Sequence, residues 1–136
     1  MLAADIAAAE WMDVAPFPDA LASQLRASLP RHFVVNNPLD LTGDATARLY
    51  KDVIAAAKGM FDVVAVIFGD PIVGTSEVID RDHPELVIYL GGAEVEREEG
   101  RLLHARGIPV FPTPERGMRA LAQLVRFGRP IERARQ

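Results

Sequence analysis

The sequence contains no cysteine among its 136 residues. This absence excludes a disulfide scaffold, a thiolate zinc site and a cysteine nucleophile, and it is typical of a cytoplasmic protein. Long hydrophobic runs are missing as well, because the most apolar stretch, residues 62–68, is far shorter than the ~20 residues of a membrane-spanning helix. The amino terminus has no basic segment followed by an apolar core, so we expect neither a signal peptide nor a membrane partner.

Positive charge is not in excess, since 15 Lys and Arg stand against 19 Asp and Glu and the formal net charge is −4. Binding to a phosphate backbone relies on clustered Lys and Arg, so we do not expect a nucleic-acid partner. His32, His83 and His104 have no companion at a metal-ligand or catalytic spacing. We therefore predict no metal site and no catalytic residue in this chain.

The composition is that of an ordinary globular domain, with 49% apolar and 25% charged residues. A chain of this length needs only one core, and we predict one domain over residues 1–127 followed by a flexible basic tail, 128–136. Apolar periodicity, caps and breakers predict the remaining elements. The predicted helices are 2–11, 19–29, a third that Thr42 or Asp44 caps and Gly59 ends, 93–106 and 113–127; the predicted strands are 32–35, 62–68, 85–90 and 108–111.

Two of these strands, DVVAVIF at 62–68 and ELVIYL at 85–90, are almost uniformly apolar. Such runs are typical of strands covered on both faces. Strand and helix alternate through the second half of the chain, and crossovers between parallel strands are right-handed. The sequence therefore predicts an α/β fold, with a parallel sheet between two helix layers.

Three segments carry a recognisable pattern. The first is NPLDLTG at residues 37–43, followed by Tyr50; the second is Leu90-Gly91-Gly92, directly after a strand; the third is GIPVFPTPER at residues 107–116. In this order and spacing, over most of residues 2–127, they resemble the NDP-forming acyl-CoA synthetases, of which the ADP-forming acetyl-CoA synthetases are one branch.

The resemblance implies the flavodoxin-like, succinyl-CoA-ligase-like domain of those enzymes. It also implies that the first strand of that domain and the Ser-Gly-Gly turn after it are missing, because relatives carry Leu-Ala-Ala-Asp, here residues 2–5, in the helix that follows. The family converts acyl-CoA, NDP and phosphate into acid, CoA and NTP through a phosphohistidine on a sister domain. CoA-binding and ATP-grasp domains or subunits are the implied partners, CoA and ATP or ADP with Mg²⁺ are implied for the full enzyme, and the chain alone is expected to be inactive.

Asn37, Asp40 and Gly43 are candidate ligand or interdomain residues, because they follow a predicted parallel strand, where the ligand crevices of α/β sheets open. The structural alternative is that Asn and Asp bond nearby backbone in the turn while Gly43 supplies an unusual backbone angle. We favour the structural alternative for this turn.

Gly91 and Gly92 are candidates for cradling an anion at the start of the next helix. The acidic run that follows, residues 94–99, would repel an anion and is itself interpreted as a solvated helix face. Glu115 and Arg116 are candidates for contact with a partner domain. The simpler interpretation is that Thr113 caps the last helix, with Pro114 at its first position and an acid in its first turn.

Two other classes of function stay open. One is a non-catalytic binding module, whose open sheet position leaves an unpaired strand edge; such edges favour pairing, so we expect a homo-oligomer. The other is a phosphoacceptor receiver domain, which has the same flavodoxin-like architecture. The receiver is disfavoured because Asp70 lacks the early acidic pair that would hold Mg²⁺ beside it.

Overall fold

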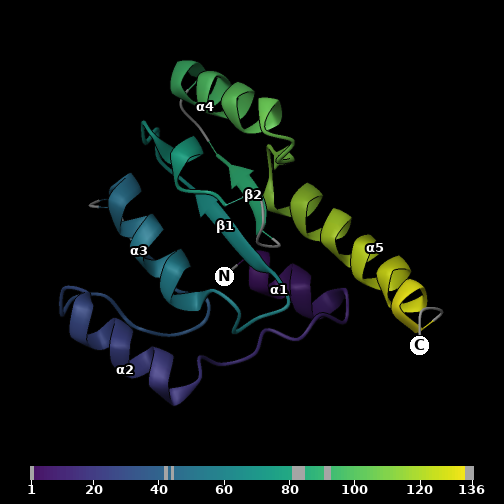
Figure 1. Cartoon of the computed structure of the whole chain (residues 1–136), viewed down its shortest axis with the longest axis horizontal. Helices are drawn as coiled ribbons and strands as arrows, with labels where there is room; N and C mark the ends of the chain where they lie inside the picture. The colour runs from purple at the N-terminus through teal and green to yellow at the C-terminus, as the bar shows by residue number, and fades with distance from the viewer. Residues whose placement is uncertain (1, 42, 44, 81–84, 91–92, 134–136) are drawn as a thin grey trace.

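The computed structural model describes residues 2–41, 43, 45–80, 85–90 and 93–133. Within these ranges, three helices precede the first strand, a 3₁₀ turn lies between the first two strands, and one helix follows each of the other two strands (Figure 1). The elements are α1 (Leu2–Ala9), α2 (Asp19–Ser28), α3 (Ala47–Ala57), β1 (Val64–Phe68), the 3₁₀ turn η1 (Thr75–Glu77), β2 (Glu85–Tyr89), α4 (Ala93–Ala105), β3 (Val110–Phe111) and α5 (Pro114–Arg133).

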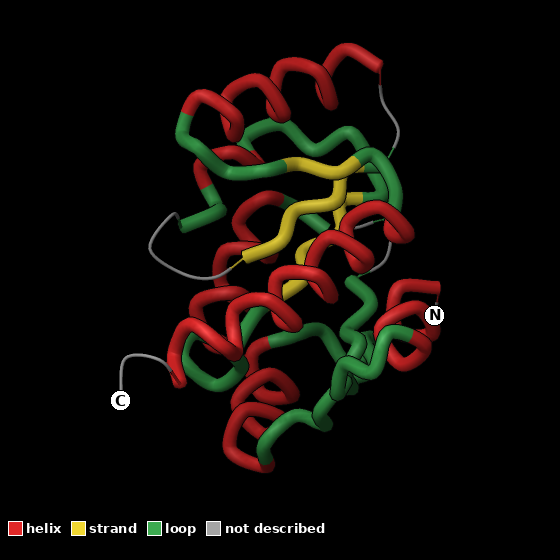
Figure 2. Tube along the Cα trace, turned by 90° about the vertical axis from the view of Figure 1, so that its right-hand side faces the viewer, coloured by secondary structure: helices red, strands yellow, loops and turns green. Residues whose placement is uncertain are grey.

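The strands form a parallel sheet in the order β1-β2-β3 (Figure 1). Val64 of β1 pairs with Glu85 of β2, and Val87 of β2 pairs with Val110 of β3. Helices lie on both sides of the sheet, which gives the three layers visible from the side (Figure 2). The structure therefore confirms the predicted α/β fold with a parallel sheet between helix layers.

Alternate strand residues face opposite helix layers, as the pleat of a strand requires. The face covered by α3 and α4 is built from Ile54, Val66, Phe68, Val87, Tyr89 and Leu103. The face covered by α1 and α5 is built from Ala7, Leu86, Ile88, Met118 and Leu121. Helix α2 packs on α3 in a third cluster, around Leu21 and Leu25. Both faces of β2 are thus buried, in agreement with its uniformly apolar sequence.

Residues 32–35 do not form the predicted strand. Phe33 is buried against α2 and α3, whereas Val34 is 76% exposed. A strand is stabilised by main-chain hydrogen bonds to a neighbouring strand, and no strand pairs with this segment in the part of the chain that the structure describes. Phe33 is buried and Val34 exposed, as in a strand, but among the described residues this segment does not form the predicted ladder of main-chain hydrogen bonds to a neighbouring strand.

Two helix ends also differ from the prediction. Helix α3 is capped by Thr46, whose Oγ1 accepts the N–H of Leu49 at 3.3 Å; the predicted caps, Thr42 and Asp44, lie outside the described residues. Helix α5 continues to Arg133, past the predicted end at 127. Gly and Pro near residue 130 weaken a helix, but they do not end this one.

The turn that ends helix α1 contains Trp11, whose left-handed backbone conformation is unfavourable for a residue with a Cβ. Trp11 has a φ of 62°, its N–H donates to Ala8 O at 3.1 Å, and the N–H of Met12 donates to Ala7 O at 2.9 Å. This is a Schellman cap, in which glycine usually takes the left-handed position. Helix α4 ends in the same way with Gly107, at a φ of 75°. The Trp11 side chain is 90% exposed, so packing does not offset the strain.

We expect Trp11→Gly to raise the free energy of unfolding by about 1 kcal/mol, because a Cβ in the left-handed region costs about that much. The measurement is urea denaturation followed by circular dichroism, since the substitution removes the one tryptophan of the sequence. Trp11→Ala keeps the Cβ and removes the indole, so this control should leave the strain in place. Equal stabilisation by both variants would show that the indole, not the backbone, is unfavourable.

Candidate functional site

The carboxyl end of β1 gathers polar groups from α3 and from the loops around it. Tyr50 of α3 donates its hydroxyl to the main-chain oxygen of Ile67 at 3.2 Å, and its ring centroid lies 4.7 Å from that of Phe68. Burial raises the pKa of Tyr50, and the negative charges of Asp70 and Asp40 raise it further. Tyr50 therefore stays protonated near neutral pH and serves as a hydrogen-bond donor, not as a base.

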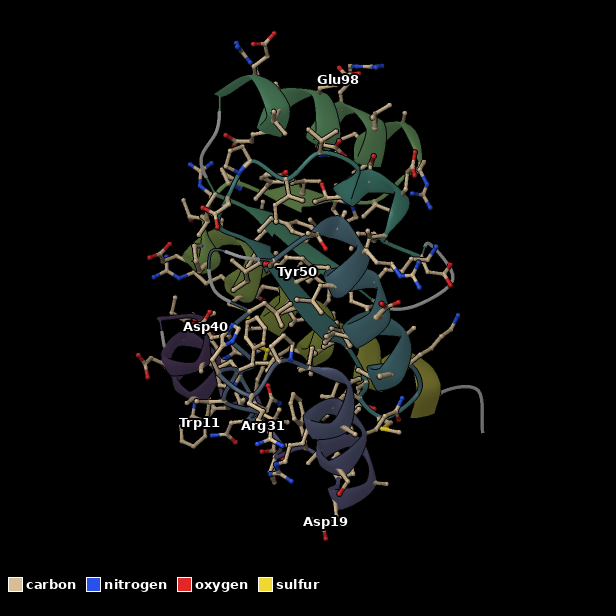
Figure 3. All side chains as sticks on the ribbon, turned by 90° about the vertical axis from the view of Figure 1, so that its left-hand side faces the viewer. Trp11, Asp19, Arg31, Asp40, Tyr50 and Glu98 are labelled. Atoms are coloured by element: carbon tan, nitrogen blue, oxygen red, sulfur yellow. The ribbon has the colours of Figure 1, made fainter. Side chains whose placement is uncertain are left out.

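The predicted turn lies beside this group, where Figure 3 shows Asp40 and Tyr50 on the same side of the molecule. Asn37 donates its Nδ2 to the main-chain oxygen of Ala15 at 2.7 Å and is followed by a cis peptide bond. Asp40 is close enough to raise the pKa of Tyr50. A Cβ at Gly43 would meet no atom within 4 Å. Asn37 thus bonds distant backbone, as the structural alternative predicts, whereas the backbone angle of Gly43 stays a prediction because residues 42 and 44 lie outside the described residues.

Glu115 and Arg116 lie across the sheet from Asp40, because α5 follows β3 and β2 separates β3 from β1. Thr113 Oγ1 accepts the N–H of Arg116 at 3.3 Å, which confirms the predicted helix cap. Hydrogen bonds from its own backbone N–H and from the Thr113 hydroxyl lower the pKa of Glu115. Gly91 and Gly92 lie outside the described residues.

The structure shows a buried carboxylate within residues 94–99, where the acidic sequence predicted a solvated helix face. Glu99 of α4 is only 5% exposed. It accepts hydrogen bonds from the N–H groups of Gly74 and Ser76, both at 2.7 Å, and from the Thr75 hydroxyl at 3.3 Å. A signal was present in the periodicity, because Glu99 lies one helical turn before the fully buried Leu103 and shares its face.

Two further side chains hold the loop between β1 and β2. The Arg106 guanidinium donates to the main-chain oxygen of Ser76 and, at 2.8 Å, to that of Ile79. The Tyr89 hydroxyl donates to the main-chain oxygen of Ile72 at 2.9 Å. Together with Glu99, these contacts fix residues 72–79 against α4 and β2. The loop at the carboxyl end of β1 is therefore positioned by side chains far away in the sequence.

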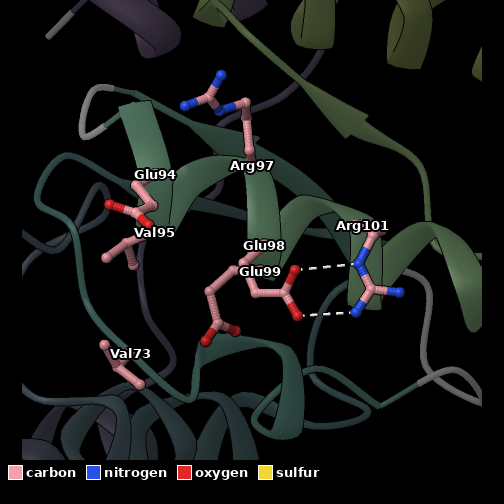
Figure 4. Close-up of a pocket in the computed structure, with 7 residues that line it drawn as sticks. All are labelled: Val73, Glu94, Val95, Arg97, Glu98, Glu99 and Arg101. Atoms are coloured by element: carbon pink, nitrogen blue, oxygen red, sulfur yellow. Dashed lines mark hydrogen bonds and ion pairs between the residues drawn. The ribbon is translucent and has the colours of Figure 1, made fainter.

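A shallow hollow of about 600 Å³ adjoins this loop (Figure 4). It is lined by Val73, Glu94, Val95, Arg97, Glu98, Glu99 and Arg101. Arg101 pairs with Glu98 at 2.7 Å, and the Glu99 carboxylate is already engaged by the loop. None of the predicted site residues that the structure describes lines the hollow, so we assign no ligand to it.

The described residues offer no cluster of three His, Asp or Glu side chains that could hold a metal ion. Among the same residues, no helix combines the length and the apolar character needed to span a membrane. The site at the carboxyl end of the sheet provides hydrogen-bonding groups and a surface for packing.

Comparison with known proteins identifies relatives of this arrangement, although no protein-family model matches the sequence. The alpha subunit of an ADP-forming acetate–CoA ligase I from Pyrococcus furiosus is 31% identical over 106 residues, which is 68% of this chain and 23% of that subunit. A trans-feruloyl-CoA synthase from an unknown prokaryotic organism is 34% identical over 139 residues, 90% of this chain and 20% of that protein.

Comparison of the fold identifies a solved structure of the same kind of enzyme. The solved dinucleotide forming acetyl-coenzyme A synthetase 1 of Candidatus Korarchaeum cryptofilum, in complex with phosphate and ADP, is 26% identical and superimposes with a TM-score of 0.80. The match covers 93% of this chain and 30% of that one. The chain thus spans less than a third of the length of these relatives. By sequence and by fold, the chain belongs to the NDP-forming acyl-CoA synthetases and corresponds to one domain of them.

Proposed function

We propose that the chain supplies the succinyl-CoA-ligase-like domain, or a split subunit, of an enzyme that converts acyl-CoA, NDP and phosphate into acid, CoA and NTP. The observation that supports this proposal is the match of 93% of the chain to only 30% of a solved acetyl-CoA synthetase. CoA-binding and ATP-grasp domains or subunits are then its partners. A cytoplasmic location is part of the same proposal.

The chemistry of the described residues supports a role that depends on partners. Tyr50 is a protonated donor, Glu99 is bonded to the loop, and the described side chains form no metal-binding cluster. Phosphoryl transfer needs a metal ion and a positioned nucleophile. In this proposal those groups, with CoA and the nucleotide, belong to the other domains, and this chain contributes the carboxyl-end surface that they meet.

We expect the purified chain alone to form no ATP from acetyl-CoA, ADP and phosphate in the presence of Mg²⁺, as measured by luciferase luminescence. The second measurement uses the trans-feruloyl-CoA synthase with its matching domain deleted, to which the chain is added. Feruloyl-CoA formation should rise above that of the deleted enzyme alone, which is the control. Turnover by the isolated chain would contradict the proposed dependence on partners, and a lack of restoration would contradict the proposed domain role.

The alternative is a non-catalytic binding or oligomerisation module derived from that domain. It is favoured by one observation, the position of β1 at the edge of the sheet. This alternative predicts a concentration-dependent dimer in sedimentation and no restoration of the deleted synthase, so the same preparation distinguishes the two functions.

A further inference from the structure

The loop after β1 is attached to the rest of the chain mainly through side chains. In the part of the chain that the structure describes, the main-chain hydrogen bonds of residues 70–78 join close neighbours, such as Glu77 N–H to Gly74 O at 3.2 Å and Val78 N–H to Thr75 O at 3.1 Å. Bonds of this kind shape a loop but do not fix its place in the fold. Its place is therefore set by contacts that reach it from other elements.

Two charged side chains of the α4 segment reach this loop. Glu99 accepts the N–H groups of Gly74 and Ser76, and Figure 4 shows its side chain pointing from α4 toward the loop. Arg106, directly after the last residue of α4, donates to the main-chain oxygens of Ser76 and Ile79. Both main-chain groups of Ser76 are thus bonded to charged side chains. Hydrogen bonds to charged groups are stronger than those between neutral groups.

Apolar packing joins the loop to the same helix. Val78 and Ile79 are buried, and they belong to the same core cluster as Leu103 of α4. Displacement of α4 would expose part of these side chains and would also leave the N–H groups that Glu99 satisfies without their acceptor. The loop therefore loses both polar and apolar partners when α4 opens.

We infer that α4 and residues 72–79 form one cooperative unit, so that the loop opens only together with α4 while the sheet and α3 stay folded. The loop lies at the carboxyl end of β1, the end at which parallel sheets bind ligands. A contact that displaces α4 is thus transmitted to that end of the sheet, and a contact that displaces the loop loosens α4.

Tyr89 of β2 is the basis of the competing description, in which the loop stays on the sheet when α4 opens. Its hydroxyl donates to Ile72 O at 2.9 Å and lies 3.5 Å from Thr75 Oγ1. Glu99 and Arg106 together make five hydrogen bonds to the loop. The larger number of bonds, each with a charged group, favours attachment of the loop to α4.

The test compares two glycine substitutions at exposed helix positions by native-state amide hydrogen exchange. Arg97→Gly weakens α4 and Lys51→Gly weakens α3 by a similar amount, because arginine and lysine have similar helix propensities. We expect Arg97→Gly to speed exchange at Leu103 of α4 and at Glu77 and Val78 of the loop by the same factor, about fourfold. Lys51→Gly should leave these three amides at the wild-type rate, although it speeds exchange within α3.

A second background tests the two charged side chains. Glu99→Ala combined with Arg106→Ala removes their bonds to the loop. In this background Arg97→Gly should still speed exchange at Leu103, but it should no longer change exchange in the loop. Loop amides that still follow Arg97→Gly there would contradict the role of the two side chains.

Two results in the otherwise wild-type chain would overturn the inference. Unchanged loop exchange in Arg97→Gly would show that the loop opens independently of α4. Faster loop exchange in Lys51→Gly would show that the loop opens only when the whole chain unfolds. Both comparisons hold even where the doubly substituted chain does not fold.

Discussion

Glu99→Ala is expected to lower the free energy of unfolding by about 3 kcal/mol. The substitution leaves the N–H groups of Gly74 and Ser76 and the hydroxyl of Thr75 without their acceptor. Each orphaned buried group costs about 1–3 kcal/mol. Glu99 also lines the hollow beside α4, so water can reach part of the vacated space. This water keeps the total cost of the three orphaned groups near the lower end of its range. Urea denaturation followed by circular dichroism measures the loss.

Glu98→Ala is the matched control on the same helix. The Glu98 carboxylate is exposed and pairs only with exposed Arg101, and such surface pairs contribute little. We expect no resolved change in stability from this variant. Similar losses from the two variants would show that helix α4, and not the bonds from Glu99 to the loop, determines the effect.

Acid titration of the wild type and of Glu99→Gln separates the contribution of the Glu99 charge to stability from the contribution of its side-chain shape. Burial alone would raise the pKa of Glu99, but hydrogen bonds from Gly74, Ser76 and Thr75 outweigh burial and lower that pKa below its ordinary value. A group with a lower pKa in the folded state adds stability above its unfolded pKa, and this stability is lost as the pH falls through the folded value. The wild-type chain should therefore lose more stability than Glu99→Gln when the pH falls below about 4.

Gly117→Val is expected to cost about 3 kcal/mol, at the upper end of typical overpacking. A Cβ at Gly117 would lie 2.8 Å from Cγ1 and 2.9 Å from Cδ1 of Ile88, and 3.4 Å from Cδ2 of Leu86. Ile88 is fully buried in the central strand, so it has no space into which to move. Valine forms helices better than glycine by less than about 1 kcal/mol, which offsets only part of the clash.

Gly100→Val is the matched control, because a Cβ at this position in α4 meets no atom within 4 Å. The better helix propensity of valine should then stabilise the chain by a few tenths of a kcal/mol. Both variants are compared by the same urea denaturation. Wild-type stability in Gly117→Val would contradict the close packing of α5 on β2.

Local sequence was sufficient for the three strands that the structure shows and for most helix ends. The uniformly apolar runs at β1 and β2 predicted their burial and parallel pairing, because parallel sheets are usually covered by helices on both faces. Gly59 and Gly107 were predicted to end α3 and α4, and both have positive φ. Thr113 was predicted to cap α5, and it does. These features depend on residues within one or two turns of each other.

The candidate site was predicted less completely, because its contacts join distant segments. The pattern at residues 37–43 indicated a turn, but the bond from Asn37 to Ala15 and the position of Asp40 near Tyr50 depend on the packing of α3 against β1. Glu99 and Arg106 were not recognised as the residues that hold the loop after β1. Their partners lie more than 20 residues away, and no local pattern encodes such a pairing.

The sequence by itself determined the α/β class, the parallel sheet and the family, because apolar periodicity, helix caps and three spaced motifs are properties of short segments. Only the tertiary structure decided that residues 32–35 form no strand and that Glu99 is buried. A strand is stable only when a neighbouring strand bonds its main chain, and a buried carboxylate is stable only when hydrogen-bond donors satisfy it. Whether these partners are present depends on how segments far apart in the chain come together.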